Sequence, residues 1–389
     1  MTFGYFAVFG AALATTLVLT PVVRVLAARR QLLVAPSERS VHETPMPNIG
    51  GVAMVGGVMV GLLVAALLGD FKQVFESSTA PLGIAVAAVV IFLVGFLDDV
   101  RKVHGEGVSA PAKLAGMVLA GGILSLAGVS TIFFRVPFLG VFSLTPDLSS
   151  FLTVVWVVGM ANAINLIDGL DGLAAGITAI AAGSFFVYGL RLDDVGVLAS
   201  GNIGPLIAVI TLAVCLGFLP YNFRPGRSHI IMGDSGALLL GLLMASSTIA
   251  VGGSTDASYS GSSFFFFAPL FIPLVILGVP MVDTAFAIVR RATKRAGVAT
   301  ADKEHLHHRL MRLGHGPRRS VLILWAWTAL LSGLVLYPTY TGRGDAVVPV
   351  GILGLALLLF TIFHPGARQA RNGDDKHDDA PLAGVGADQ

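Results

Sequence analysis

Residues 162–176 read NAINLIDGLDGLAAG, which places two amides and two carboxylates at the end of an apolar run. Charged groups in or beside a membrane span are costly, so they usually mark a site that binds ions or performs chemistry. Asp168 and Asp171 are three residues apart and share one face if a helix starts here. Small residues for helix packing would explain the glycines but not four polar side chains. The segment therefore predicts one wall of a polar site between apolar helices.

The composition predicts an all-α, polytopic integral membrane protein. Hydrophobic residues make up 55% of the chain, charged residues 12%, and the mean hydropathy is +0.82, whereas soluble domains carry about 25% charged residues. A net charge of +2 gives no argument for nucleic-acid binding. The single cysteine, Cys215, lies in an apolar run, which predicts a buried structural thiol and excludes an intrachain disulfide.

We count about eleven apolar runs, most of them long enough to cross about 30 Å of hydrocarbon as a helix. The runs lie near residues 3–27, 49–69, 81–97, 111–128, 150–166, 172–190, 202–219, 235–252, 265–289, 320–339 and 346–364. One set of the intervening loops holds four of the 25 Lys and Arg residues, and the other set holds the remaining 21. Because cytoplasmic loops collect basic residues, we expect the N-terminus outside and the C-terminus in the cytoplasm.

Residues 1–364 are expected to form a single transmembrane catalytic domain with its active-site loops in the cytoplasm. The first run is too long for a signal-peptide core and has no basic stretch ahead of it, so we interpret it as a retained span. Residues 365–389 are rich in Gly, Asp and Ala and cannot bury a core. We expect them to form a disordered cytoplasmic tail.

Acidic side chains recur on the predicted cytoplasmic side. Asp98 and Asp99 are adjacent at the end of a span, where like charges repel and suggest a cation between or beside them. Mg²⁺ prefers carboxylate oxygens together with substrate phosphate, although a polar cap beside Arg101 and Lys102 would give the same pattern. Asp234 lies in a Gly-Asp-Ser-Gly step that opens another span, where a carboxylate is also a common capping residue.

Two loops on the same side contain histidine. His42 lies among two prolines and a glycine pair, which indicates either an anion-binding helix start or an ordinary turn. The later loop reads His305-Leu306-His307-His308-Arg309. No cysteine or well-spaced acid completes a transition-metal site there, and His with Arg equally suits phosphate binding.

Together, these motifs resemble the polyprenyl-phosphate N-acetylhexosamine-1-phosphate transferase family of glycosyltransferase 4 type. The resemblance covers roughly residues 1–335 and rests on the acidic pair, the 162–176 segment, the Gly-Asp-Ser-Gly step and the histidine motif, in this order. Members transfer a sugar-1-phosphate from a UDP-sugar to a membrane polyprenyl phosphate and release UMP, using Mg²⁺; Mn²⁺ is an alternative ion. The His-Leu-His-His-Arg form resembles the GlcNAc-1-phosphate branch, whereas the peptidoglycan branch typically has three consecutive histidines.

The resemblance implies a role for each matching position. It places Asp98, Asp99, Asp234, His305, His307 and His308 among the catalytic residues, with Asp98, Asp99, Asn165 and Asp234 at the metal. It places His42, Lys113, Asn165, Asp168, Asp171, Asn222 and Arg309 in substrate binding. One departure is Ile231, where many members carry a Phe that can stack on uracil.

We therefore predict transfer of GlcNAc-1-phosphate from UDP-GlcNAc to undecaprenyl or decaprenyl phosphate at the bacterial inner membrane, with the active site facing the cytoplasm. The partners are the UDP-sugar, the polyprenyl phosphate and membrane lipid, without nucleic acid; a homodimer is compatible with the sequence. The alternatives are a phospho-MurNAc-pentapeptide transferase and, in another class, an ion-coupled transporter, which would place its ionisable residues near mid-span. A prenyltransferase would need Asp-Asp-x-x-Asp, but the fifth position here is Lys102.

Overall fold

The computed structural model describes a bundle of long helices joined by short loops. It describes residues 2–35, 44–131, 133–136, 140–196, 198–224, 228–252, 277–279, 310–311, 313–341 and 347–363. The predicted site residues His42, His305, His307, His308 and Arg309 lie outside these ranges, as does the tail from residue 365 to residue 389.

The described residues form eleven α-helices and one short 3-10 helix. They are α1 (Thr2–Arg29), α2 (Gly51–Leu67), η1 (Gly69–Phe71), α3 (Lys72–Glu76), α4 (Ala80–Val103), α5 (Ala110–Leu126), α6 (Pro146–Ile167), α7 (Leu173–Asp194), α8 (Gly204–Asn222), α9 (Gly233–Gly252), α13 (Pro317–Thr341) and α14 (Val347–Phe363). Proline occupies one of the first two positions of α4, α5, α6 and α8, where its missing N–H costs no helical hydrogen bond.

The described helices confirm a mostly helical, polytopic membrane protein. Seven helices are long and apolar enough to cross a membrane, and an eighth span is present if α2 and the following turn, bent by 89°, count as one. Shorter apolar helices cover residues 110–126 and 349–361. Every predicted run except 265–289 coincides with a described helix, while the count of eleven spans and the orientation of the termini stay predictions.

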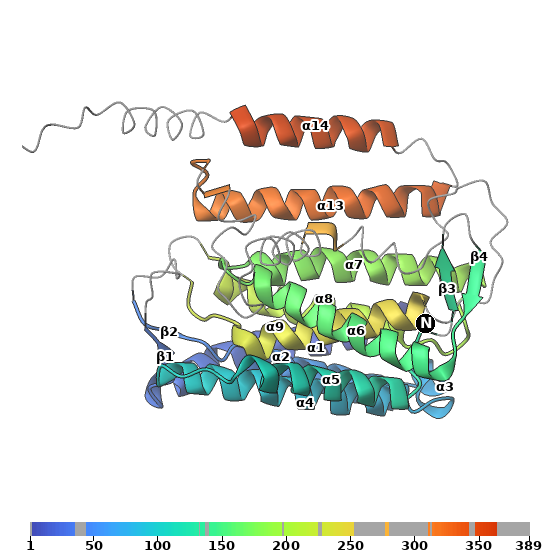
Figure 1. Cartoon of the computed structure of the whole chain (residues 1–389), viewed down its shortest axis with the longest axis horizontal. Helices are drawn as coiled ribbons and strands as arrows, with labels where there is room; N and C mark the ends of the chain where they lie inside the picture. The colour runs from blue at the N-terminus through green and yellow to red at the C-terminus, as the bar shows by residue number, and fades with distance from the viewer. Residues whose placement is uncertain are drawn as a thin grey trace, which may run out of the picture.

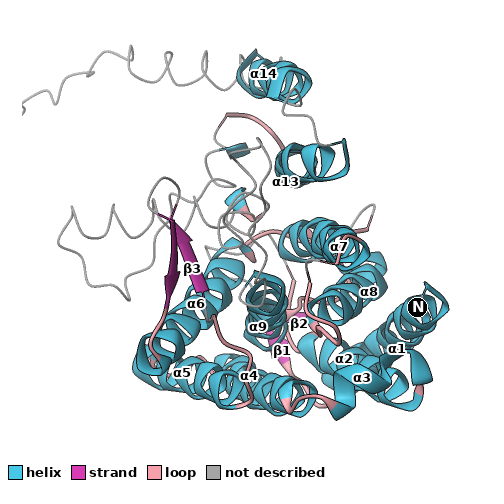
Figure 2. Cartoon of the chain, turned by 90° about the vertical axis from the view of Figure 1, so that its right-hand side faces the viewer, coloured by secondary structure: helices cyan, strands magenta, loops and turns pink. Residues whose placement is uncertain are grey.

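Helix α9 is the centre of the bundle. All of its residues are buried, and it contacts α2, α4, α5, α6, α7 and α8. Figure 2 shows α9 end-on with α4, α6, α7 and α8 around it, α13 against α7, and α14 further out. A helix that is apolar all round is found inside a protein core or a membrane span. Here it is both, because its own neighbours separate it from lipid.

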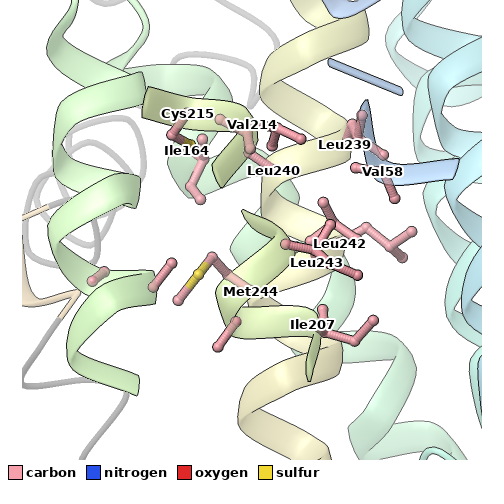
Figure 3. Packing of buried hydrophobic residues seen from close by; sticks show 14 of the residues in the cluster. Val58, Ile164, Ile207, Val214, Cys215, Leu239, Leu240, Leu242, Leu243 and Met244 are labelled. Carbon is pink, nitrogen blue, oxygen red and sulfur yellow. The ribbon is translucent and has the colours of Figure 1, made fainter. Parts of the chain in front are cut away.

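Aliphatic side chains of α9 fill the space between its neighbours. Leu239, Leu240, Leu242, Leu243 and Met244 are at most 1% exposed. They pack toward α2, α6 and α8, from which Figure 3 shows Val58, Ile164, Ile207, Val214 and Cys215. The burial of the Cys215 thiol confirms its predicted structural role.

Two short antiparallel hairpins modify the all-α prediction. Strand β1 (Leu33–Val34) pairs with β2 (Met46–Pro47), and β3 (Phe133–Val136) pairs with β4 (Gly140–Ser143). They lie at opposite ends of the bundle (Figure 1). Backbone polar groups in loops need hydrogen-bond partners, and here other loop segments supply them, a pairing that helical periodicity cannot predict. The β1–β2 end is also the end at which α4 finishes and α9 begins.

Gly241 sets the distance between α6 and α9. A Cβ atom at this position would overlap the backbone of Ala161, so the two helices approach as closely as small residues allow. We expect Gly241→Ala to lower the melting temperature of the purified protein in detergent, because overpacking costs about 1–3 kcal/mol.

The matched control is Gly159→Ala, since nothing lies within 4 Å of a Cβ built at Gly159. This change should be neutral or slightly stabilising, by up to about 1 kcal/mol. Equal melting temperatures for the two variants would contradict the close α6–α9 contact.

Candidate active site

Three carboxylates meet at the end of the bundle that carries β1 and β2. Asp98 and Asp99 lie near the C-terminus of α4, and Asp234 lies in the first turn of α9. One oxygen from each lies within 4.8 Å of the others. Asp98 and Asp99 are fully buried, and Asp234 is 8% exposed. The structure thus brings Asp234 to a pair of adjacent acids that lies more than a hundred residues earlier in the sequence.

Two lysines join Asp98 to Asp234. The Lys102 Nζ lies 2.7 Å from Asp98 Oδ2 and 2.7 Å from Asp234 Oδ1. The Lys113 Nζ lies 2.7 Å from the same Asp98 oxygen and 2.7 Å from Asp234 Oδ2. Asp98 Oδ1 accepts the backbone N–H of Val108 at 2.7 Å. These four side chains form a closed ring of alternating charge, which we call the Asp–Lys ring.

Asp99 stands outside that ring and caps α9. Its Oδ1 accepts the backbone N–H of Asp234 at 2.8 Å and its Oδ2 accepts that of Ser235 at 2.9 Å. The side-chain amide of Asn48 donates to Oδ1 at 3.1 Å. The first N–H groups of a helix have no partner within the helix, and those of α9 are buried away from water. The Asp99 carboxylate therefore satisfies α9 from a neighbouring helix.

Gly233 makes this cap sterically accessible. Its φ is +71°, and a Cβ there would overlap the Asn48 carbonyl and the Asp99 carboxylate. Glycine adopts positive φ without the strain that a side chain would add. The Gly-Asp step is thus needed for Asp99 to reach the α9 terminus.

The loop before α9 is held by a short backbone ladder. The Ile231 N–H donates to Pro47 at 2.9 Å, the Gly50 N–H donates to Ile231 at 3.0 Å, and the Gly51 N–H donates to Met232 at 3.0 Å. Ile231 is thus half-buried and held by two backbone hydrogen bonds, three residues before Asp234.

The segment of residues 168–172 forms the turn between α6 and α7. Its Asp168 is half-buried, and burial, followed by repulsion from Asp234, Asp171 and Asp99, raises the pKa of Asp168 well above its usual range. Asp168 therefore lies within electrostatic reach of Asp99 and Asp234. Asn165 lies in the last turn of α6, and its carbonyl accepts the Asp168 N–H at 3.3 Å.

Asn222 ties this turn to the loop before α9. Its Oδ1 accepts the Gly172 N–H at 2.7 Å, and its Nδ2 donates to the Ile230 carbonyl at 3.0 Å. The side chain is 3% exposed. Both polar atoms therefore serve the backbone, which favours a positioning role over the predicted contact with substrate.

Sequence reasoning missed two residues of the site, Lys102 and Asn48. Lys102 follows Asp98 by four residues on one helix, a spacing that places opposite charges side by side. That spacing is visible in the sequence, but it fits a polar cap at the end of a span as well as it fits a substrate site. Asn48 had no such signal, because its partner Asp99 is 51 residues away in the sequence.

Comparison with known proteins assigns the chain to a family. It is 37% identical to a decaprenyl-phosphate N-acetylglucosaminephosphotransferase of Mycobacterium tuberculosis over 367 residues, which cover 92% of this chain and 87% of the relative. The profile of glycosyl transferase family 4 matches residues 81–252. The chain belongs to glycosyl transferase family 4. The resemblance seen in the motifs is thereby confirmed.

Two further family 4 relatives frame the comparison. A probable undecaprenyl-phosphate N-acetylglucosaminyl 1-phosphate transferase of Bacillus subtilis is 36% identical over 317 residues, 82% of this chain and 80% of the relative. A phospho-N-acetylmuramoyl-pentapeptide-transferase of Desulforudis audaxviator is 33% identical over 350 residues, 84% of this chain and 96% of the relative. The family 4 match spans the Asp–Lys ring, Asp99 and the 168–172 turn.

Removing the cap should destabilise this family 4 protein. Asp99→Ala leaves the N–H groups of Asp234 and Ser235 buried without an acceptor, and each such group costs about 1–3 kcal/mol. We expect a large drop in melting temperature in detergent. The control is Asp147→Ala, which removes an exposed acid from the first turn of α6 and should cost no more than about 1 kcal/mol. Similar losses for both variants would refute the capping role.

The raised pKa of Asp168 predicts a pH-dependent stability. A carboxyl whose pKa is raised by folding favours the folded state fully below the unfolded pKa of about 3.9 and progressively less as pH rises toward the folded pKa. Asp168→Asn should therefore match the wild type near pH 4 and become increasingly more stable than it toward pH 8. Thermal unfolding in EDTA across this range measures the difference. A constant difference at all pH values would contradict it, and the 76% exposed Asp194, changed to Asn, is the control.

Proposed function

We propose that this family 4 protein transfers GlcNAc-1-phosphate from UDP-GlcNAc to a polyprenyl phosphate and releases UMP. The observation that carries the proposal is the Asp–Lys ring at the N-terminus of the buried helix α9. In this ring two ammonium groups each lie 2.7 Å from both Asp98 and Asp234. Phosphoryl transfer depends mainly on positioning and on neutralising the charge of the phosphates. A ring that holds both signs of charge at a helix N-terminus can position the phosphates and neutralise their charge.

The acidic cluster fits a divalent cation. Three buried carboxylates each present an oxygen within 4.8 Å of the others, and among the described residues the ammonium groups of Lys102 and Lys113 offset two of these charges. We propose that Asp98 and Asp234 would hold Mg²⁺, with Mn²⁺ as a substitute, because hard cations prefer carboxylate oxygens and phosphate. When bound, the ion would neutralise charge on the diphosphate of the donor.

The residues of the ring have a second use once substrates arrive. Lys102 and Lys113 are 36% and 21% exposed at their side chains, so their ammonium groups can turn from the carboxylates toward phosphate oxygens. A polyprenyl phosphate, with a second pKa near about 6, is mostly a dianion at neutral pH. Its oxygen attacks the β-phosphorus, a new P–O bond forms, and the bond from the β-phosphorus to the bridging oxygen breaks, so that UMP leaves with the electron pair.

The contacts of the two adjacent acids suggest different roles. Asp99 accepts three hydrogen bonds from the protein, which supports positioning of Asp234 rather than contact with substrate. Asp98 faces both lysines and is the better candidate to orient the acceptor phosphate or to take its remaining proton. We favour direct attack, and a covalent phospho-sugar enzyme trapped from UDP-sugar without lipid would overturn this choice.

The donor is inferred from the histidine motif and the relatives. The motif from His305 to Arg309 has the form of the GlcNAc-1-phosphate branch. The Mycobacterium tuberculosis and Bacillus subtilis relatives, at 37% and 36% identity, carry N-acetylglucosamine names. The pentapeptide-transferase relative of Desulforudis audaxviator is 33% identical. We propose that His305, His307, His308 and Arg309 contact the donor phosphates and that His42 lies on the same cytoplasmic side of the membrane.

We propose that the site faces the cytoplasm of a bacterial cell across its inner membrane. The distribution of 21 basic residues against four supports this orientation. UDP-sugars are soluble and the acceptor lies in the membrane, so the reaction needs a site at this boundary. A transporter is disfavoured, because the acids gather at helix ends and the chain belongs to a transferase family.

Membranes containing the protein should label polyprenyl phosphate from radioactive UDP-GlcNAc in the presence of Mg²⁺. Labelling should not occur from UDP-MurNAc-pentapeptide. Lys102→Met should reduce the rate by about 100-fold or more, as does loss of one preorganised charge at a transition state. Lys72→Met is the control, because Lys72 is 70% exposed and pairs only loosely with Glu76, at 3.7 Å.

Labelling from UDP-MurNAc-pentapeptide alone would overturn the GlcNAc assignment and favour the peptidoglycan branch. Full activity of Lys102→Met, or of Asp98→Asn, would contradict the assignment of the Asp–Lys ring to catalysis.

A further inference from the structure

A second cluster of basic groups involves the loop that precedes α9. Arg24 near the end of α1 places Nη1 3.2 Å from His229 Nδ1, and Arg224 just after α8 places Nη1 3.4 Å from the same nitrogen. None of these three residues belongs to the Asp–Lys ring. Two guanidinium groups therefore converge on one imidazole.

The backbone fixes this arrangement. The Tyr221 hydroxyl donates to the Leu17 carbonyl of α1 at 3.0 Å, and the His229 N–H donates to the Tyr221 carbonyl at 2.9 Å. Leu17 and Arg24 are seven residues apart, two helical turns, so they share one side of α1. The α1–α8 contact thus positions Arg24 beside the loop that carries Arg224 and His229.

The cluster has more donors than it can satisfy internally. Burial and the nearby guanidinium groups of Arg24 and Arg224 lower the pKa of His229, so the ring is neutral and offers a single lone pair at Nδ1. Two guanidinium groups compete for that lone pair. Within the described residues neither has a carboxylate partner, so two positive charges face one point without compensation.

The same end of α1 carries exposed aliphatic side chains. Val22 and Val25 of α1 are 47% and 49% exposed, and Val18, one turn earlier, is 63% exposed. In a helix that is long and apolar enough to span the membrane, exposed aliphatic side chains face lipid. Val25 directly follows Arg24 and lies about 100° around the helix from it, whereas Val18 and Val22 lie about 120° and 160° away. An anion that binds Arg24 and Arg224 would therefore have its hydrocarbon chain pass Val25 to reach the lipid-facing side of α1.

We propose that Arg24, Arg224 and His229 bind the phosphate of a membrane phosphomonoester lipid whose chain lies along the exposed side of α1. A phosphomonoester carries close to two negative charges at pH 7, which matches two guanidinium groups, whereas a phospholipid diester carries one. Arginine binds phosphate through paired N–H donors. Naming polyprenyl phosphate as the natural occupant rests on the proposed function, and the site then holds the acceptor at the membrane surface outside the Asp–Lys ring.

Binding of lipids to the purified full-length protein in EDTA, without UDP-sugar, tests this site. Native mass spectrometry would compare undecaprenyl phosphate, undecaprenol and phosphatidylglycerol. We expect Arg24→Gln and Arg224→Gln each to weaken binding of undecaprenyl phosphate roughly tenfold, the loss expected for one charged hydrogen bond. Binding of undecaprenol and phosphatidylglycerol should change little.

Arg29→Gln is the matched control, because Arg29 is an exposed arginine on the same end of α1, five residues and about 140° away from Arg24. It removes the same charge and should leave binding within about twofold, as expected for general electrostatics outside the site. An equal loss in Arg29→Gln, an equal loss for phosphatidylglycerol, or wild-type binding by both single variants would overturn the proposal.

The outcome is independent of the transfer reaction. If the arginine variants lose undecaprenyl phosphate binding and the wild type transfers no GlcNAc-1-phosphate, the lipid site is supported and the proposed function is refuted. Normal transfer with unchanged lipid binding in Arg24→Gln and Arg224→Gln would do the reverse. Because Arg24 and Arg224 are exposed and come from separate elements, either single variant carries the test if the other does not fold.

Discussion

The N-terminus of α9 is the constraint on which the site depends. Every residue of this helix is buried, so its first N–H groups cannot reach water, and an unpaired buried donor costs about 1–3 kcal/mol. Asp99 of α4 satisfies two of them with one carboxylate. The same carboxylate accepts from Asn48, so one charged group joins α4, α9 and the loop before α2. The glycine at position 233 leaves room for this contact.

This cap also determines where the charged side chains of the site lie. Asp99 fixes the start of α9, which brings Asp234 opposite Asp98, and Lys102 and Lys113 bridge the two at 2.7 Å. Buried carboxylates would repel without such partners, and buried charges persist in proteins only when paired. The lysines compensate the acids in the absence of substrate, and their partial exposure lets them respond to phosphate. The two adjacent aspartates therefore differ in their contacts, because Asp99 binds backbone and amide N–H groups and Asp98 pairs with the two lysines.

The two candidate binding regions differ in their charge and in their surroundings. The Asp–Lys ring contains both signs of charge, and every residue of α9 behind it is buried, with apolar side chains packed around it as Figure 3 shows. The Arg24–Arg224–His229 cluster contains only positive and neutral groups and borders exposed aliphatic residues. A mixed-charge ring suits a metal and phosphates that exchange, whereas an uncompensated cationic pair suits a stable anion. The proposed reaction between a soluble nucleotide and a lipid phosphate would use both kinds of site.

The sequence by itself determined that this is a helical membrane protein, which family it belongs to, and which acidic residues form the site. Hydropathy is a local property, so apolar runs predicted the described helices, and motif order predicted Asp98, Asp99 and Asp234 as one site. It could not separate the roles of Asp98 and Asp99, reveal the Asn222 clamp or find the hairpins, because each depends on hydrogen bonds between segments far apart in the chain. Only the tertiary structure decided those roles, since the burial of α9 makes its unpaired backbone donors costly and thereby selects which carboxylate must serve them.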